Sequence, residues 1–107
     1  MNEKRFFGML GFAMRAGRIV LGTDAVISSM SAAKGKRAHL ILVSEEASRG
    51  TRARLSAKCE FYGIKHLTVS TSPQRLGDLL GKTYAPVCLA ITDEGFALQI
   101  EKALGEA

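Results

Sequence analysis

The segment Leu40-Ile41-Leu42-Val43 is an unbroken apolar run, and it restricts the fold more than any other part of the chain. A strand that is apolar at every position requires a sheet whose two faces are both covered. Segments with a helical spacing of apolar residues precede and follow this run, and they can supply the cover. The run therefore favours a sheet enclosed between two layers of helices.

The other apolar patterns alternate between helix and strand. Helices are expected over residues 3–16, from residue 23 or 24 to about residue 35, and over 50–62, 72–80 and 94–105. Strands are expected over residues 19–21, 40–43, 64–70 and 85–93. This order predicts an α/β fold, a three-layer α/β/α sandwich with a small mixed sheet of three main strands and a short fourth.

Three of the expected helices carry an apolar stripe that should face the sheet. The stripes are Val26, Ile27, Met30 and Ala33 in the second helix, Leu55, Cys59 and Tyr62 in the third, and Phe96, Ile100 and Leu104 in the last.

A single domain is expected over residues 1–107, because a chain of this length can bury one core but not two. The sequence contains no apolar run long enough to span a membrane, and Gly8, Gly11 and Arg15 interrupt the N-terminal segment, which argues against a signal peptide. We therefore expect a cytoplasmic protein with no membrane partner. Cys59 and Cys88 stand far from other metal-ligating residues, so buried thiols are expected rather than a disulfide or a zinc site.

The charge of the chain is unevenly distributed. Residues 1–58 contain eleven Lys and Arg against four acidic residues, whereas residues 59–107 contain four against six. Such asymmetry indicates a polyanionic partner on one surface, and nucleic acid is favoured over a membrane because no basic amphipathic helix with an aromatic apolar face is present. A basic protein without such a partner is the plainer alternative.

Basic residues and a glycine-led helix start suggest where that surface lies. Gly22 and Thr23 begin the second helix, whose first amides can bind phosphate. We expect Arg18 to lie close to these amides and to form one surface with them and the basic turn 34–37. The basic groups are Arg15 and Arg18; Lys34, Lys36 and Arg37; and Arg49, Arg52 and Arg54.

Signals for catalysis are weaker. The stretch GDLLGKT, residues 77–83, has three residues between its glycines where a nucleotide-binding P-loop has four, and it leads into an expected strand rather than a helix. We therefore interpret Gly81 as the cap of the preceding helix. The remaining candidates for catalysis are His39, His66, Cys59, Asp93 and Glu94. Ordinary structural roles account for all of them, so no cofactor, metal or small-molecule substrate is expected.

A series of motifs between Phe6 and about Ala97 points to a known family. In order, they are RAGR at residues 15–18, Gly22-Thr23, LILVSEEAS, CEFYGI, LGDLLGK and AITDEGFA. Together they resemble the YlxQ-like bacterial branch of the kink-turn-binding ribosomal proteins, a family of the archaeal and eukaryotic large-subunit ribosomal protein type. The resemblance implies an α/β/α sandwich that binds RNA.

The resemblance also implies which residues contact RNA. In this family, the RNA surface combines the glycine-led start of the second helix, here Gly22 to Ser28, with an apolar loop before the last strand, here about Tyr84 to Cys88. Together with the basic groups, the expected RNA-binding residues are Arg15, Arg18, Gly22, Thr23, Asp24, Ala25, Ser28, Lys34, Lys36, Arg37, Tyr84, Ala85, Pro86, Val87 and Cys88.

Three of these residues depart from the pattern of members that hold kink-turns tightly. Those members have Asn, Glu and Lys where this chain has Asp24, Ala25 and Ser28. An aspartate can only accept hydrogen bonds at a base edge and repels phosphate. We therefore expect an RNA-binding protein that is ribosome-associated or binds structured RNA, with weakened recognition of a standard kink-turn. The alternatives are a protein-interaction adaptor that keeps the fold and, third, a small nucleotide-binding or hydrolytic enzyme.

Overall fold

The computed structural model describes residues 1–106. Its helices are α1 Glu3–Arg15, α2 Thr23–Ser29, α3 Arg49–Tyr62, α4 Pro73–Leu79 and α5 Glu94–Gly105, and its strands are β1 Ile19–Leu21, β2 Leu40–Ser44, β3 Lys65–Val69 and β4 Cys88–Ile91.

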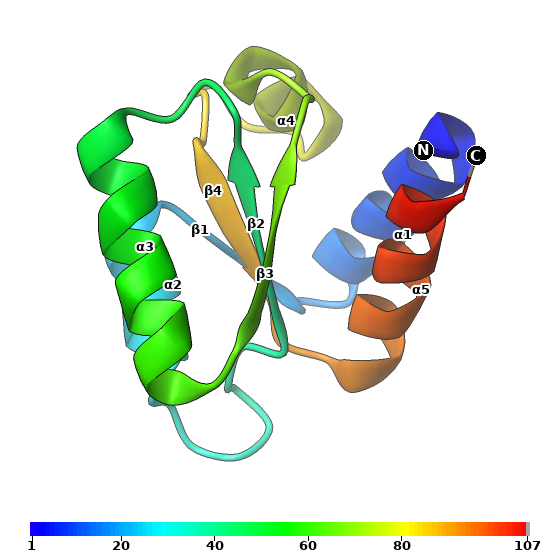
Figure 1. The fold of residues 1–107 in the computed structure, drawn as a ribbon. Helices are drawn as coiled ribbons and strands as arrows, with labels where there is room; N and C mark the ends of the chain where they lie inside the picture. The colour runs from blue at the N-terminus through cyan, green and yellow to red at the C-terminus, as the bar shows by residue number, and fades with distance from the viewer. Residues whose placement is uncertain (107) are drawn as a thin grey trace.

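The strands form one mixed sheet in the order β1-β4-β2-β3. The pair β2 and β3 is parallel, whereas β4 runs antiparallel to both of its neighbours, β1 and β2. Helices α1 and α5 cover one face of the sheet, α2 and α3 cover the other, and α4 lies at one end (Figure 1). The three-layer α/β/α sandwich expected from the sequence is confirmed.

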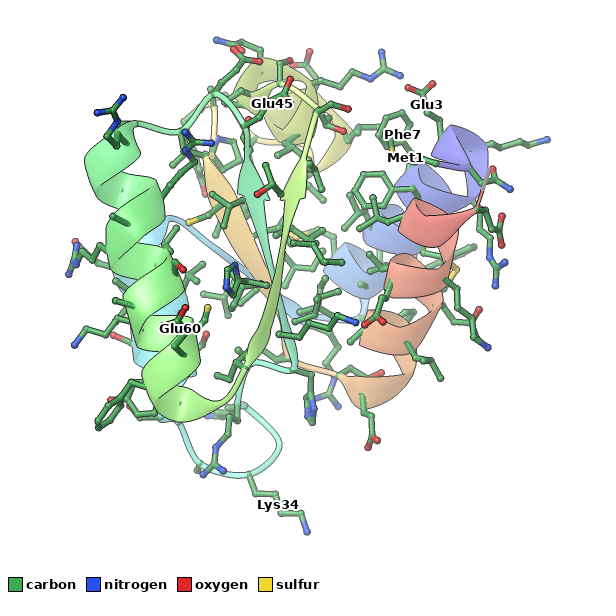
Figure 2. The ribbon with its side chains drawn as sticks, viewed as in Figure 1. Met1, Glu3, Phe7, Lys34, Glu45 and Glu60 are labelled. Atoms are coloured by element: carbon green, nitrogen blue, oxygen red, sulfur yellow. The ribbon has the colours of Figure 1, made fainter. Side chains whose placement is uncertain are left out.

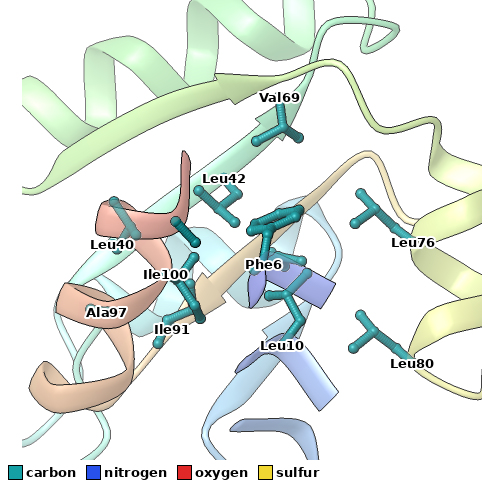
Figure 3. Packing of buried hydrophobic residues seen from close by; sticks show 12 residues of the cluster. Phe6, Leu10, Leu40, Leu42, Val69, Leu76, Leu80, Ile91, Ala97 and Ile100 are labelled. Carbon is teal, nitrogen blue, oxygen red and sulfur yellow. The ribbon is translucent and has the colours of Figure 1, made fainter. Parts of the chain in front are cut away.

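The apolar run in β2 supplies both faces of this sheet. Leu40 and Leu42 belong to the core under α1 and α5, whereas Ile41 and Val43 belong to the core under α2 and α3. Figure 3 shows the first of these cores, with Phe6 from α1 between the sheet and α4. Because successive side chains of a strand point to opposite faces, a strand buried on both faces must be apolar at every position.

Helix α2 ends at Ser29, so the prediction that it continues to about residue 35 is wrong. The carbonyl of Ser29 accepts hydrogen bonds from the amides of Ala32 and Ala38, which turn the chain back toward β2. The hydroxyl of Ser29 donates to the carbonyl of Val26, a local bond that competes with helix continuation. Ala33, expected on the apolar stripe, is therefore exposed in the turn.

Tyr62 was expected to face the sheet, but it is 40% exposed, and its ring meets that of the exposed Phe61 edge to face. The reason is the end of α3, where Gly63 takes a left-handed conformation with φ of 69°. The amide of Ile64 then donates to the carbonyl of Cys59, and Ile64 packs on the core in place of Tyr62. This is the hydrophobic contact that accompanies a Schellman end.

The first and last helices are joined at their ends. The amide of Asn2 donates to the carbonyl of Ala103 at 2.8 Å, and its side chain caps α1 by accepting from the amide of Arg5. The guanidinium of Arg5 in turn donates to Gln99 and Glu106. The two ends of the described chain consequently lie side by side (Figure 1).

Candidate nucleic-acid interface

The start of α2 presents unpaired backbone donors at one end of the sheet. Gly22 has φ of 94° and ψ of 149°, a conformation that favours glycine, and no side chain within residues 1–106 caps the helix. The first intrahelical bond runs from the amide of Val26 to the carbonyl of Gly22, so the amides of Thr23 to Ala25 precede it. Asp24, Ala25 and Ser28 are exposed along one side of this helix.

The loop before β4 lies directly beside this helix start. The amide of Gly22 donates to the carbonyl of Cys88 at 3.3 Å, and the Sγ of Cys88 lies 3.8 Å from the Oγ1 of Thr23. Tyr84 and Ala85 are exposed, and Val87 is half-buried. We call the exposed face that these two segments form the α2-start surface; it comprises Gly22, Thr23, Asp24, Ala25, Ser28, Tyr84, Ala85 and Val87.

Two residues expected in the RNA contact lie underneath that surface. Cys88 is the first residue of β4 and is fully buried, and Pro86 is buried against α4. Their side chains can therefore position the loop but cannot reach a ligand in this conformation.

Gly77 in α4 holds this loop in place, a role that the sequence analysis missed. A Cβ at this position would stand 2.2 Å from the carbonyl oxygen of Tyr84 and 3.5 Å from Cδ of Pro86. Helix and loop can thus approach only because residue 77 lacks a side chain. The sequence did not single out Gly77, because Gly8 also lies inside a helix and a Cβ there would meet nothing within 4 Å.

Arg54 was counted among the basic groups but was left out of the expected RNA-binding residues. It projects from α3, and its Nη1 lies 3.4 Å from the Oδ1 of Asp24 at the start of α2. Both side chains are largely exposed, so the pair contributes little to stability, but it places a guanidinium beside the free amides. The arrangement depends on how α3 packs against α2, and local sequence patterns do not report it.

Arg18 and the basic turn 34–37 do not join this surface, and the expectation that they form one continuous surface with the start of α2 is wrong. Arg18 precedes β1, and its Nη1 donates to the carbonyl of Gly35 at 3.1 Å. Gly22 follows β1, four residues further along an extended chain, which corresponds to about 13 Å. Helix α2 then runs back, so the exposed turn with Lys34, Lys36 and Arg37 lies at the Arg18 end. Figure 2 shows Lys34 at the opposite end of the molecule from Glu45, which follows β2.

Arg15 also lies away from the α2-start surface. It belongs to the last turn of α1, and its guanidinium stands 4.9 Å from the centre of the Phe12 ring. The expected residues are thus divided into two groups, one at each end of β1.

The two cysteines lie in the core behind the α2-start surface and are both free thiols. Burial raises the pKa of Cys59 to about 11, with a smaller contribution from Cys88. Burial also raises the pKa of Cys88, although its hydrogen bond with Thr23 acts in the opposite direction. Neither thiol has the depressed pKa typical of a nucleophile.

Two further candidates, Asp93 and Gly81, have structural roles. Asp93 caps α5, since its Oδ2 accepts from the amide of Phe96 at 2.9 Å. Gly81 follows α4 with φ of 70°, as expected of a helix end, and the amide of Lys82 donates to the carbonyl of Gly77. Within residues 1–106, we find no cluster of His, Cys, Asp and Glu that could hold a metal ion. No helix in the same range has the length and apolar character needed to cross a membrane.

Comparisons with known proteins place this geometry in a family. Residues 4–101 match the model of the ribosomal protein L7Ae/L30e/S12e/Gadd45 family. The chain is 39% identical to RNA-binding protein YlxQ of Bacillus subtilis (strain 168), over 91% of this chain and 92% of that protein. It is 22% identical to RNA-binding protein YlxQ of Enterococcus faecium, over 96% and 94% of the two chains.

Solved structures agree with this assignment. A protein of unknown function from Bacillus halodurans C is 26% identical and superposes with a TM-score of 0.83, over 95% of this chain and 98% of that one. The Giardia lamblia 15.5kD RNA binding protein, 14% identical, shares the fold with a TM-score of 0.75, over 96% and 84% of the two chains. The resemblance seen in the sequence is confirmed, and this chain belongs to the ribosomal protein L7Ae/L30e/S12e/Gadd45 family.

Proposed function

We propose that this protein binds structured RNA through the α2-start surface. The observation that carries the proposal is the juxtaposition of Gly22–Ala25 with the Tyr84–Val87 loop, in a chain closely similar to a protein named for RNA binding. Kink-turn-like RNA or ribosomal RNA in the cytoplasm is the proposed target. Binding rather than catalysis is the proposed activity.

The chemistry of this surface suits a sugar-phosphate backbone. Three amides at a helix start donate to anionic oxygens, and the guanidinium of Arg54 stands beside them. The exposed ring of Tyr84 on the neighbouring loop offers a flat face on which a base can stack. Asp24, by contrast, accepts hydrogen bonds only, so we propose that phosphate contacts contribute more to affinity than base contacts do.

Binding should accordingly weaken steeply as salt is added, because each neutralised phosphate releases counterions. Titration of a fluorescent kink-turn hairpin at two ionic strengths measures this dependence. A protein-interaction adaptor would show no binding even at low salt, and that result would reject the proposal.

Charge changes at Ser28 locate the surface without disturbing the glycine turn. Ser28→Glu places a negative charge on the exposed side of α2 and should lower RNA affinity about tenfold or more, whereas Ser28→Lys should raise it. Lys102→Glu on the exposed side of α5 is the control. It changes the net charge by two units instead of one, yet it should weaken binding less than Ser28→Glu.

Circular dichroism of each variant confirms that it is folded. If Lys102→Glu weakens binding as much as Ser28→Glu, only net charge matters, and the α2-start surface is not the binding site. Arg18→Ala and Lys36→Ala test the opposite end of β1 in the same titration. Since that end is separate, we expect each to weaken binding less than Ser28→Glu.

A further inference from the structure

A groove of about 340 Å³ lies between α3 and the edge strand β3. Arg49, Arg52 and Ser56 of α3 form one wall, and His66 and Thr68 of β3 form the other. Its volume is at the lower end of the range for small-ligand sites. The groove is separate from the α2-start surface, because helix α3 lies between them (Figure 1).

The groove exists because small side chains face the strand. Ala53 and Ser56 of α3 leave space against β3 that larger residues would fill. On the strand, His66 and Thr68 stand two residues apart and therefore share a face. When a helix covers one face of a parallel strand, the residues on that face are usually apolar, as Ile41 and Val43 of β2 are. Polar groups at these positions are not needed by the core.

The charge of this groove contrasts with that of the groove on the other face of β3. The second groove, of about 560 Å³, contains Glu45 and the ion pair between Lys65 and Glu101, with 2.7 Å between Nζ and Oε2. The groove beside α3 has two arginines and a histidine, and no carboxylate among the described residues that line it. Nor does Arg49 or Arg52 form an ion pair with any residue in 1–106. Such a lining attracts an anion.

The position of the groove connects it to the proposed RNA surface. Arg54 projects from the opposite side of α3 and reaches Asp24 at the start of α2. Arg49 and Arg52 lie on the same N-terminal half of α3, on the side of β3. An RNA strand that leaves the α2-start surface across this half of the helix would thus meet arginines on both sides.

We propose that the groove formed by Arg49, Arg52, Ser56, His66 and Thr68 binds a backbone phosphate of the RNA segment adjoining the one held at the α2-start surface. The arginines neutralise the phosphate, and the hydroxyls of Ser56 and Thr68 donate hydrogen bonds to its oxygens. Val43 forms part of the apolar lining against which a ribose can pack. This inference rests on the proposed function, since the phosphate belongs to the RNA that is proposed to bind at the α2-start surface.

Paired charge removal tests the groove. The probe is a fluorescent kink-turn hairpin with short single-stranded uridine extensions at both ends. Arg49→Gln with Arg52→Gln should lower its affinity about tenfold at low salt and reduce the slope of log K against log salt by about 1 to 2. Lys4→Gln with Lys102→Gln removes the same charge from exposed positions on α1 and α5 and should leave the affinity within about twofold of the unmodified protein.

The outcomes separate the two proposals. If the unmodified protein does not bind the hairpin, the proposed function fails, and this inference fails with it. If it binds, and the two double variants lose affinity equally, the α2-start surface is retained while the groove is rejected. Circular dichroism checks folding, which should be unchanged because both arginines are exposed and unpaired within the described chain.

Thiol protection identifies which anion the groove takes. Ser56→Cys introduces an accessible thiol, whereas Cys59 and Cys88 are buried. The hairpin should slow maleimide labelling of residue 56 at concentrations that saturate binding. Millimolar inorganic phosphate and a mononucleotide, which also carry phosphate groups, should not slow this labelling. Equal protection by either small anion would make the groove a small-ligand site and overturn the assignment to RNA.

Discussion

At the scale of single residues, Asp24 and its neighbours matter most for the proposed RNA contact. Asp24, Ala25 and Ser28 are the three residues that depart from the pattern expected of tight kink-turn binders, and all three are exposed on α2. Arg54 lies 3.4 Å from Asp24 and offsets part of its negative charge. The proposed site thus has a guanidinium supplied by another helix but lacks the side-chain amide that would donate to a base.

Restoring the three residues should strengthen binding to a standard kink-turn. Asp24→Asn supplies a donor as well as an acceptor, Ala25→Glu adds an acceptor and Ser28→Lys adds a phosphate contact. A restored base contact contributes about 1 to 3 kcal/mol in comparable groove readout, so a titration of the triple variant should show the change. If the unmodified protein already binds as tightly as the triple variant, these residues do not limit recognition.

Ionisation of the Cys59 thiol should lower the stability of the folded protein at alkaline pH. Its pKa is raised from 9.0 to about 11 by burial, so the folded state holds this proton more tightly than the unfolded state does. The contribution to stability is complete below pH 9 and is lost as the pH rises toward about 11. Denaturant titrations across this range should show a falling free energy of unfolding, with a smaller fall in Cys59→Ala.

At the scale of elements, the contact between α4 and the loop before β4 is the most restrictive. Gly77→Ala would place a Cβ 2.2 Å from the backbone oxygen of Tyr84, and backbone cannot move aside as a flexible side chain can. We expect a loss of about 1 to 3 kcal/mol in the free energy of unfolding, the usual range for overpacking. RNA affinity should also fall, because Tyr84 and Ala85 would be displaced. The exposed Gly8→Ala in α1, where a Cβ meets nothing within 4 Å, is the control and should not destabilise the protein.

The elements also show how far the sequence alone could go. Periodicity and glycine caps located the helices and strands found within residues 1–106, because these depend on local backbone preference and on burial. The end of α2 was misplaced, since Met30 and Ala33 continue the apolar pattern while the carbonyl of Ser29 is taken by the amide of Ala38. That hydrogen bond depends on where β2 begins in space.

The candidate site was less predictable for the same reason. The helix start and the loop were correctly expected to lie together, but that expectation came from the family resemblance. Arg18 and Gly22 are four residues apart in sequence, yet strand β1 separates them, so they lie at opposite ends of the sheet. Arg54 and Asp24 are thirty apart and in contact. Distances of this kind follow from packing and not from spacing.

At the scale of the whole molecule, the two cores share their strands. Leu89 and Ile91 of β4 belong to the core under α1 and α5, whereas Cys88 and Ala90 belong to the core under α2 and α3. Neither core can lose its packing without disturbing strands that also form the other. We therefore propose that residues 1–107 form a single cooperative domain.

Such a domain should unfold in one transition. Thermal unfolding followed by far-UV circular dichroism should coincide with calorimetry, with equal calorimetric and van't Hoff enthalpies. Two separated transitions would mean that the helical layers melt independently, contrary to the proposal.

The hydrogen bond between Asn2 and Ala103 has a consequence for chain connectivity. Because the two ends of the described chain meet beside α1 and α5, a short linker could close the protein into a ring, which could be reopened elsewhere. The exposed turn between Gly35 and Lys36 is a suitable opening, since no strand or helix is cut there. A circular permutant of this design should keep the circular dichroism spectrum of the parent. Its new ends would leave the molecule beside Arg18, on the far side of β1 from the start of α2.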